Sequence, residues 1–249
     1  MDAGMIQDLT AVIWKELKEF FASGGSRGRY ISLIVLGLFG VVLPLTMAST
    51  VWPSSVTPVV EYGLYLPVIL IISVGADSFA GERERHTLET LLASRLSDIA
   101  IFVGKLLAIT IFGWAQSVLA AILAIIIVNI KLAGSPGFYS GVDALSILGI
   151  GALAALAAAG ATTLVSLRAS TVRQAQQMLS IGLIVIVIGS TFGLQTLSPD
   201  LRLRLLTTIA TSSFTTLAWE AAAILAVVAV ILIAICMTLF RRPKLIIGS

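Results

Sequence analysis

Residues 101–130 read IFVGKLLAITIFGWAQSVLAAILAIIIVNI and contain a single charged side chain, Lys105. A straight helix needs only about 20 apolar residues to cross a hydrocarbon core. The stretch is continuously apolar and does not alternate, which favours an α-helix over a strand of a membrane barrel. It therefore predicts a membrane-spanning helix that is tilted or that begins in the interface.

Five further apolar stretches are long enough to cross a bilayer, and the composition of the chain agrees with them. Of the 249 residues, 58% are hydrophobic and only 12% are charged, whereas soluble domains carry about 25% charged residues. We expect an all-α polytopic membrane protein with six transmembrane helices, at residues 30–48, 61–80, 101–130, 144–167, 178–197 and 216–240. These spans form one transmembrane domain over 30–249, preceded by an N-terminal segment, 1–29.

The basic residues predict the orientation of these spans. Of the 16 Lys and Arg residues, all except Lys131, Arg202 and Arg204 belong to the N-terminal segment, the linkers after the second and fourth spans with the start of the third span, or the C-terminal tail. Cytoplasmic segments of membrane proteins carry an excess of Lys and Arg. We therefore expect a protein of the plasma membrane with both termini in the cytoplasm. An even number of spans agrees with this, because it places both termini on the same side.

Residues 5–21 have the spacing of an amphipathic helix. Apolar side chains recur at helical intervals, and Lys15 and Glu19 can pair four residues apart on the opposite face. The helix is predicted to lie in the inner membrane interface, where Trp14 suits the depth of the headgroups. Its interfacial residues are Trp14, Lys15, Glu16, Lys18 and Glu19. Two roles stay open on spacing alone: contact with a cytosolic partner, or membrane attachment without one.

The linker between the second and third expected spans is the most distinctive part of the chain. Residues 79–92 read FAGERERHTLETLL, in which a charged run precedes leucines that share one helix face with residues 96 and 99. Gly81 permits a sharp turn out of the membrane. A loop that only joined two spans would need a few polar residues, so we interpret this one as a helical element that a partner grips. The alternative is an interfacial helix whose charges face water.

This linker, with Gly104 and Lys105 after it, resembles the signature of type-2 ABC transporter permeases, the ABC-2 family of exporter membrane subunits. In that family a Gly-Glu-(Lys/Arg)-Glu run leads into Thr-Leu-Glu, paired leucines and a Gly-Lys pair. Residues 14–17, WKEL, resemble the family's N-terminal interfacial helix. The chain departs from the family at His86, where Gly is usual, and at residues 95 and 96, where Pro is common.

The resemblance implies a coupling helix that sits in a groove of a separate ABC ATPase subunit. The residues that it assigns to this contact are Gly81, Glu82, Arg83, Glu84, Arg85, Thr87, Leu88, Glu89, Leu91 and Leu92. It also implies an export permease that works as a homodimer, or beside a related permease, with two ATPase subunits. No nucleic acid is expected as a partner.

The chain contains no phosphate-binding loop of its own. That loop needs Gly five residues ahead of a Gly-Lys pair, and Ile99 stands there instead. ATP and Mg²⁺ are therefore expected on the partner ATPase, and no cofactor is expected on this chain. One histidine, His86, and one cysteine, Cys236, offer no metal site. We expect a transport subunit that is not an enzyme.

An ATP-independent secondary transporter or channel is the alternative function. Inverted repeats and charges deep within the spans would support it, but Asp77, Glu61 and Glu220 all lie near the ends of expected spans. An intramembrane enzyme would need clustered catalytic residues, and a purely structural anchor would bind the ATPase without transport. The weakly charged spans suit a lipid, an amphipathic peptide or a drug-like molecule as cargo.

Overall fold

Every regular element that the structure describes is a helix. The computed structural model describes residues 3–22, 26–46, 56–131, 140–211 and 213–240. In chain order the elements are α1 (Ala3–Ala22), α2 (Ser26–Gly37), η1 (Leu38–Val42), α4 (Val56–Pro58), η2 (Val59–Tyr65), α5 (Leu66–Glu84), α6 (Leu88–Leu92), α7 (Asp98–Lys131), α8 (Gly141–Arg168), α9 (Val172–Thr196), α10 (Pro199–Thr211) and α11 (Phe214–Leu239). The prediction of an all-α protein is confirmed.

Four helical segments of the described chain are long and apolar enough to cross a membrane. They are Val59–Glu84, Asp98–Lys131, Gly141–Arg168 and Phe214–Leu239, and they include the second, third, fourth and sixth expected spans. The first expected span corresponds to a shorter apolar helix, Ser32–Thr46, and its residues 47 and 48 lie outside the described ranges. α9 covers most of the fifth. The protein is thus a multi-pass membrane protein, and the count of six spans stays a prediction.

α8 is the central helix, because its small side chains let its neighbours approach closely. It packs against η2, α5, α7 and α11, and its buried face between Gly151 and Gly160 consists largely of alanine and glycine. The tightest approach is to α5, where a Cβ added to Gly75 would lie 2.5 Å from the Cβ of Thr162. Close packing of this kind holds spans together in lipid, where the hydrophobic effect between helices is absent.

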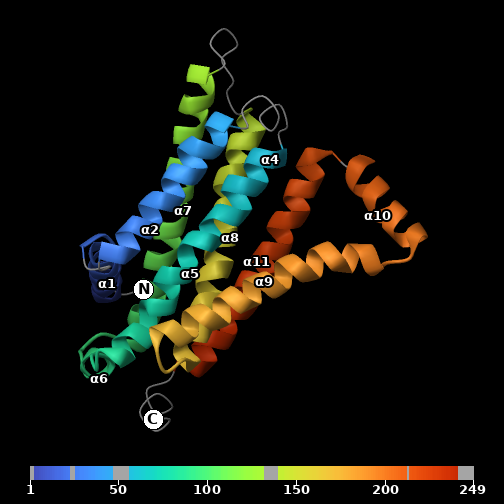
Figure 1. Cartoon of the computed structure of the whole chain (residues 1–249). Helices are drawn as coiled ribbons and strands as arrows, with labels where there is room; N and C mark the ends of the chain where they lie inside the picture. Colours follow the sequence, from blue (N-terminus) through green and yellow to red (C-terminus); the bar gives the residue numbers. More distant parts are fainter. Residues whose placement is uncertain (1–2, 23–25, 47–55, 132–139, 212, 241–249) are drawn as a thin grey trace.

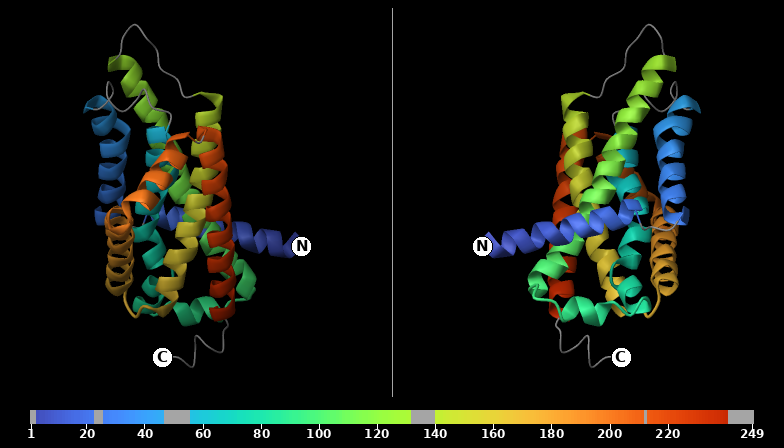
Figure 2. Two further views of the ribbon diagram at one scale, coloured as in Figure 1. Left: turned by 90° about the vertical axis from the view of Figure 1, so that its right-hand side faces the viewer. Right: turned by 90° about the vertical axis from the view of Figure 1, so that its left-hand side faces the viewer.

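α1 lies crosswise to the spans and packs against α7 (Figure 2). α7 has 34 residues, so at about 1.5 Å per residue it is roughly 50 Å long, well beyond a hydrocarbon core of about 30 Å. Its first turns extend past α1 toward the end of the bundle that also carries α6, the α8–α9 turn and the end of α11 (Figures 1 and 2). We call this end the α6 end.

α9, α10 and α11 form an open triangle beside the bundle. α9 leaves the α6 end at a steep tilt, α10 turns back, and α11 returns along α8 (Figure 1). α10 occupies the linker between the fifth and sixth expected spans, where the sequence did not predict a helix. Its first turns carry Leu201, Arg202, Leu203 and Arg204, which alternate and lack helical spacing.

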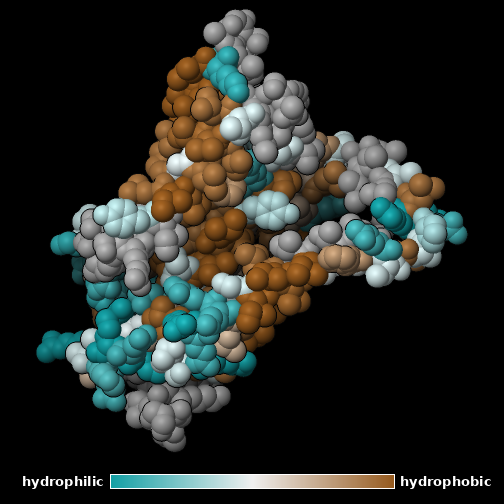
Figure 3. All heavy atoms as spheres, viewed as in Figure 1, coloured by the Kyte–Doolittle hydropathy of each residue, from teal (hydrophilic) through white to brown (hydrophobic). Residues whose placement is uncertain are grey.

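Apolar side chains cover the middle of the molecule and polar ones gather at its ends. Figure 3 shows hydrophobic residues over α2, α7 and α9, and hydrophilic residues around α6 and over α10. Large exposed side chains of the middle region include Ile34, Ile122 and Ile186. Such a belt matches a surface that faces lipid, with polar ends that face headgroups and water.

Candidate functional site

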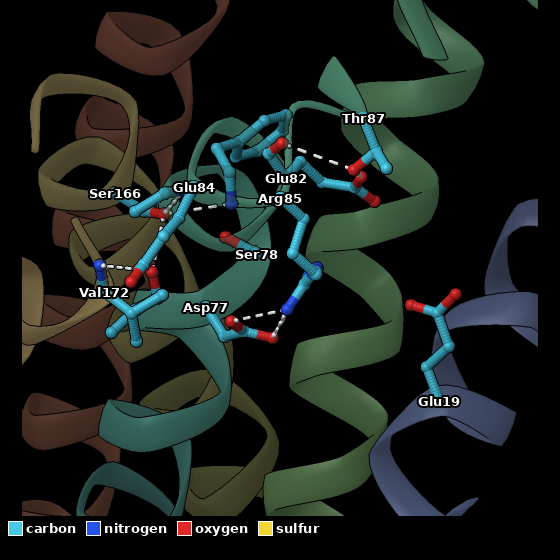
Figure 4. A network of polar contacts seen from close by, with 12 residues as sticks. Glu19, Asp77, Ser78, Glu82, Glu84, Arg85, Thr87, Ser166 and Val172 are labelled. Carbon is cyan, nitrogen blue, oxygen red and sulfur yellow. Dashed lines mark hydrogen bonds and ion pairs between the residues drawn. The ribbon is translucent and has the colours of Figure 1, made fainter. Parts of the chain in front are cut away.

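α5 ends at the α6 end in a Schellman motif, a hydrogen-bonded reversal of the chain. The N–H of Thr87 donates to the carbonyl of Glu82 at 2.9 Å, and the N–H of His86 donates to the carbonyl of Arg83 at 3.1 Å. The hydroxyl of Thr87 also donates to the Glu82 carboxylate (Figure 4). The charged run therefore stays helical, and the chain turns only after it.

The chain turns at His86, and the prediction of a turn at Gly81 is wrong. His86 has a φ of 57°, in the left-handed region that glycine adopts most easily. Gly81 lies inside α5, where the Asp77 side chain rests against it. The absence of a side chain at Gly81 thus makes room for Asp77. The residue with the left-handed backbone is His86, where the family that the chain resembles usually has Gly.

Replacing His86 by glycine is expected to raise the free energy of unfolding by about 1 kcal/mol, because a Cβ disfavours the left-handed conformation by roughly that amount. Unfolding of the purified protein in detergent micelles measures the change. His86→Ala removes the same imidazole but keeps the Cβ, so it should bring no gain. Equal gains in both variants would assign the effect to the imidazole and not to the backbone.

Glu82 joins three helices through a buried cluster of ion pairs. The ammonium of Lys105, in α7, lies 2.7 Å from a carboxylate oxygen of Glu16, in α1, and 3.4 Å from one of Glu82, in α5. These three residues are 1%, 3% and 5% exposed. Buried charges are tolerated only when they are paired and hydrogen-bonded. The cluster therefore fixes the position of α1 against α5 and α7.

Lys15 adds a second cation at the edge of this cluster. Its ammonium lies 3.4 Å from oxygens of Glu82 and Glu19, which confirms the predicted pairing with Glu19. Partial burial lowers the pKa of Lys15, but the charges of Glu16, Glu82 and Glu19 outweigh it, so its pKa lies above the ordinary value. The carboxylates of Glu16, Glu19 and Glu82 approach one another within 4.8 Å, and the ammonium groups of Lys15 and Lys105 offset two of their three negative charges.

Gly104 explains how α1 comes near enough for these contacts. A Cβ on Gly104 would lie 2.6 Å from Cγ1 of Val12, so α1 and α7 touch almost backbone to side chain there. Phe20 packs edge-on against Phe112 further along the same contact, with ring centroids 5.6 Å apart. The two residues of the Gly-Lys pair thus act on the same contact: Gly104 lets α1 pack closely against α7, and Lys105 binds α1 through Glu16.

Arg83 and Glu84 contact the junction between α8 and α9. The guanidinium of Arg83 donates to the carbonyls of Ala169 and Leu167, the latter at 3.1 Å. A carboxylate oxygen of Glu84 accepts the N–H of Val172 at 3.1 Å, as Figure 4 shows. A cation thus meets the C-terminal end of α8 and an anion meets the N-terminal start of α9, which is the favourable sign at each helix end.

Two further contacts hold the last turns of α5. Arg85 pairs with Asp77 at 3.2 Å, eight residues or about two helical turns back along the chain. The buried hydroxyl of Ser166, in α8, accepts the N–H groups of Phe79 and Ala80 at 3.0 and 2.9 Å and donates to the carbonyl of Ala76 at 2.9 Å. α5 is therefore anchored by polar bonds to α8 and α9, as Figure 4 shows, and by the ion pairs of Glu82 to α1 and α7.

The structure places the predicted site residues on α1, on the last turns of α5 and on α6, and it divides them by exposure. Gly81, Glu82, Leu88 and Glu16 are buried; Arg83, Leu91 and Glu19 are half-buried; Glu84, Arg85, Thr87, Glu89, Trp14, Lys15 and Lys18 are exposed. Leu92 ends α6, and its side chain lies outside the described ones. The predicted leucine-faced helix is shorter than expected, since α6 spans only Leu88–Leu92 and Ile99 is exposed.

Lys105 is the residue that sequence reasoning missed. It was counted with the charged linker, but it lies in α7 and is buried against Glu16, with its ammonium 5.6 Å from the ring centroid of Phe79. One signal could have found it. A lone lysine within an apolar run costs free energy unless an anion pairs with it, and the flanking helices offered Glu16 and Glu82.

Comparisons with known proteins give the family of this chain and one relative. The model of the family described as ABC-2 type transporter matches residues 7–200. The chain is 30% identical over 141 residues to the ABC transporter permease protein NatB of Bacillus subtilis (strain 168). That alignment covers 50% of this chain and 36% of the relative, so the chain matches about a third of the relative's length.

Proposed function

The chain belongs to the ABC-2 type transporter family, and on that premise we propose that it is the membrane subunit of an ATP-driven exporter. ATP and Mg²⁺ are bound by a separate ABC ATPase, present in two copies. The permease works as a homodimer or beside a related permease. It spans the plasma membrane six times, and the α6 end, with both termini, faces the cytoplasm.

One observation supports the contact with the ATPase. The outer face of α6 is exposed, while the last turn of α5, from which α6 extends, is held on several sides. Glu82, Arg83 and Glu84 bind α1, α7 and the α8–α9 junction, and Leu88 is buried. Glu89 and Thr90 of α6 face outward. A partner that pushes on such an element moves the helices at its base, because the element has little freedom to bend alone.

We propose that only some of the residues that the resemblance assigns to the ATPase contact touch the ATPase directly. The outer face of the turn and of α6 supplies the contact, through His86, Thr87 and Glu89. Glu82 and Arg83 pass the force inward through their partners. Trp14 is 72% exposed on α1 and suits the headgroup region, so α1 lies in the inner interface and is held to the spans by Glu16.

The energetic requirement on this coupling is differential binding. ATP shifts the spans between inward-facing and outward-facing arrangements only if the ATPase binds one arrangement of the α6 end more tightly than the other. The cargo that we propose is apolar or amphipathic, such as a lipid, a peptide or a drug-like molecule, because charged residues are few along the spans.

Charge reversal of Glu89 is expected to reduce co-purification of the permease with its ATPase about tenfold or more, as rim charges of an interface steer association. The experiment co-expresses the permease with ABC ATPase chains of the same genome, one at a time, and compares the parent with Glu89→Lys. The same ATPase should show permease-stimulated ATP hydrolysis with the parent.

The matched controls are Arg202→Glu and Arg204→Glu on α10, which are exposed charges away from the α6 end. They should leave co-purification unchanged. Binding that survives Glu89→Lys but is lost with the α10 variants would place the ATPase on the wrong end of the molecule and overturn the proposal. Glu82 is unsuitable for this test, because reversing a buried charge disturbs the fold itself.

A further inference from the structure

Among the side chains that the structure describes, those of α9 that pack against the bundle lie near its start. Its first turns meet α5 and α8 through a small cluster of alanines, Ala76, Ala80, Ala169 and Ala175, which Leu179 borders. Farther along, large apolar side chains point away from the described chain, and Ile184 and Ile186 are 53% and 69% exposed. A helix held at one end by small side chains has a defined pivot but a weakly defined angle.

Two hydrogen-bonded contacts from α5 lie at this pivot. The last carbonyls of α8 have no partner within their own helix, and neither does the N–H of Val172, the first residue of α9. Arg83 donates to carbonyls at the end of α8, and Glu84 accepts from the N–H of Val172 at 3.1 Å. Thr171 satisfies a different N–H, that of Gln174, at 3.2 Å. Glu84, a residue of α5, therefore caps the N-terminus of α9.

We propose that Arg83 and Glu84 are positioning residues that clasp the α8–α9 turn and set the tilt of α9 from the last turn of α5. A rotation of that turn is then carried to the far end of α9. Because a helix rises about 1.5 Å per residue, a change of about 5° at the base of these 25 residues moves the far end by roughly 3 Å. That an ATPase drives this rotation rests on the proposed function, whereas the clasp itself does not depend on that function.

The clasp is tested by a distance between two spin labels on the full chain in lipid nanodiscs, without ATPase. One label replaces Gln195 near the end of α9, and the other replaces Ile130 near the end of α7; both positions are exposed. Cys236, which is buried, is replaced by alanine. Glu84→Ala and Val172→Pro each remove one partner of the same hydrogen bond and should shift the distance by about 3 Å.

Proline suits this substitution, since the first position of a helix tolerates it and Thr171 already has the extended backbone that precedes proline, with φ −134° and ψ 155°. If both variants delete one shared bond, the double variant shifts the distance no further than either single one. Glu84→Gln keeps an accepting oxygen and should retain the parental distance. Glu89→Ala, on exposed α6, is the control and should also retain it.

Parental distances in Glu84→Ala and Val172→Pro would overturn the clasp, as would shifts that add in the double variant or a Glu84→Gln shift equal to that of Glu84→Ala. These outcomes are separate from the fate of the proposed function, because no ATPase is present. ATPase binding that survives Glu89→Lys would count against the proposed function, and it would leave the measured clasp unaffected.

Discussion

Lys105→Met is expected to lower the free energy of unfolding by about 3–5 kcal/mol, because it leaves two buried carboxylates without their cation. Glu16 loses the ammonium at 2.7 Å, and the only cation left for either carboxylate among the described contacts is the half-exposed Lys15, 3.6 Å from Glu16 and 3.4 Å from Glu82. The loss should release α1 from α7 before the spans separate. Unfolding in detergent micelles measures the stability, and the reactivity of a cysteine at the buried position Val12 measures the release of α1.

A triple variant separates this cause from lost packing. Lys105→Met, Glu16→Met and Glu82→Met together replace the buried ions by apolar side chains, an exchange that is often close to neutral. The triple variant should therefore be more stable than Lys105→Met alone. Lys18→Met, on the exposed face of α1, should change stability by less than about 0.5 kcal/mol. A triple variant at least as unstable as the single one would contradict the ion-pair explanation.

The helices were predictable because length and apolarity decide them in lipid. Residues 101–130 form α7 and residues 144–167 form most of α8, since a backbone in hydrocarbon must satisfy its hydrogen bonds within its own helix. α1 was predictable from apolar spacing and from the Lys15–Glu19 pair. In each case the information is local, within a few turns of one helix.

The partners of the charged run were not predictable, because they come from distant parts of the chain. Glu82 meets Lys105 and also Lys15, and Glu84 meets Val172. A run of alternating charges looks the same whether it faces water or is shared among helices. Only the close approach at Gly104 decides that α1 comes within reach of Lys105. Sequence reasoning therefore selected the segments of the candidate site but did not predict which of their charged side chains are buried and which are exposed.

The turn at the end of α5 was misplaced for a related reason. A glycine in a sequence usually indicates a backbone that can turn. Gly81 instead leaves room for the side chain of Asp77, and it is His86 that adopts the left-handed conformation. The hydrogen bonds from His86 and Thr87 back to α5 decide the turn, and these depend on where the helix stops. The resembling family's glycine at position 86 was the better indication, because only that position needs a positive φ.

Gly75→Ala is expected to separate α5 from α8 and to cost roughly 1–3 kcal/mol, the range for overpacking a tight core. The added Cβ would lie 2.5 Å from the Cβ of Thr162 and 3.2 Å from its Cγ2, and both atoms sit close to the α8 backbone, where they cannot move aside. The bonds from Ser166 to α5 lie one turn farther along the same contact. Unfolding in detergent micelles measures the loss.

Gly149→Ala and Gly182→Ala are the matched controls, because a Cβ at either glycine meets no atom within 4 Å. Both should keep or slightly raise stability, since alanine is the better helix former by about 1 kcal/mol. Exchanging the small residue across the contact, as Gly75→Ala with Thr162→Gly, should recover part of the loss, because the clashing Cβ is then gone from α8. A double variant whose loss equals the sum of the two single losses would mean that the two positions do not share one contact. The close approach that places Ser166, Arg83 and Glu84 against their partners would then need another cause.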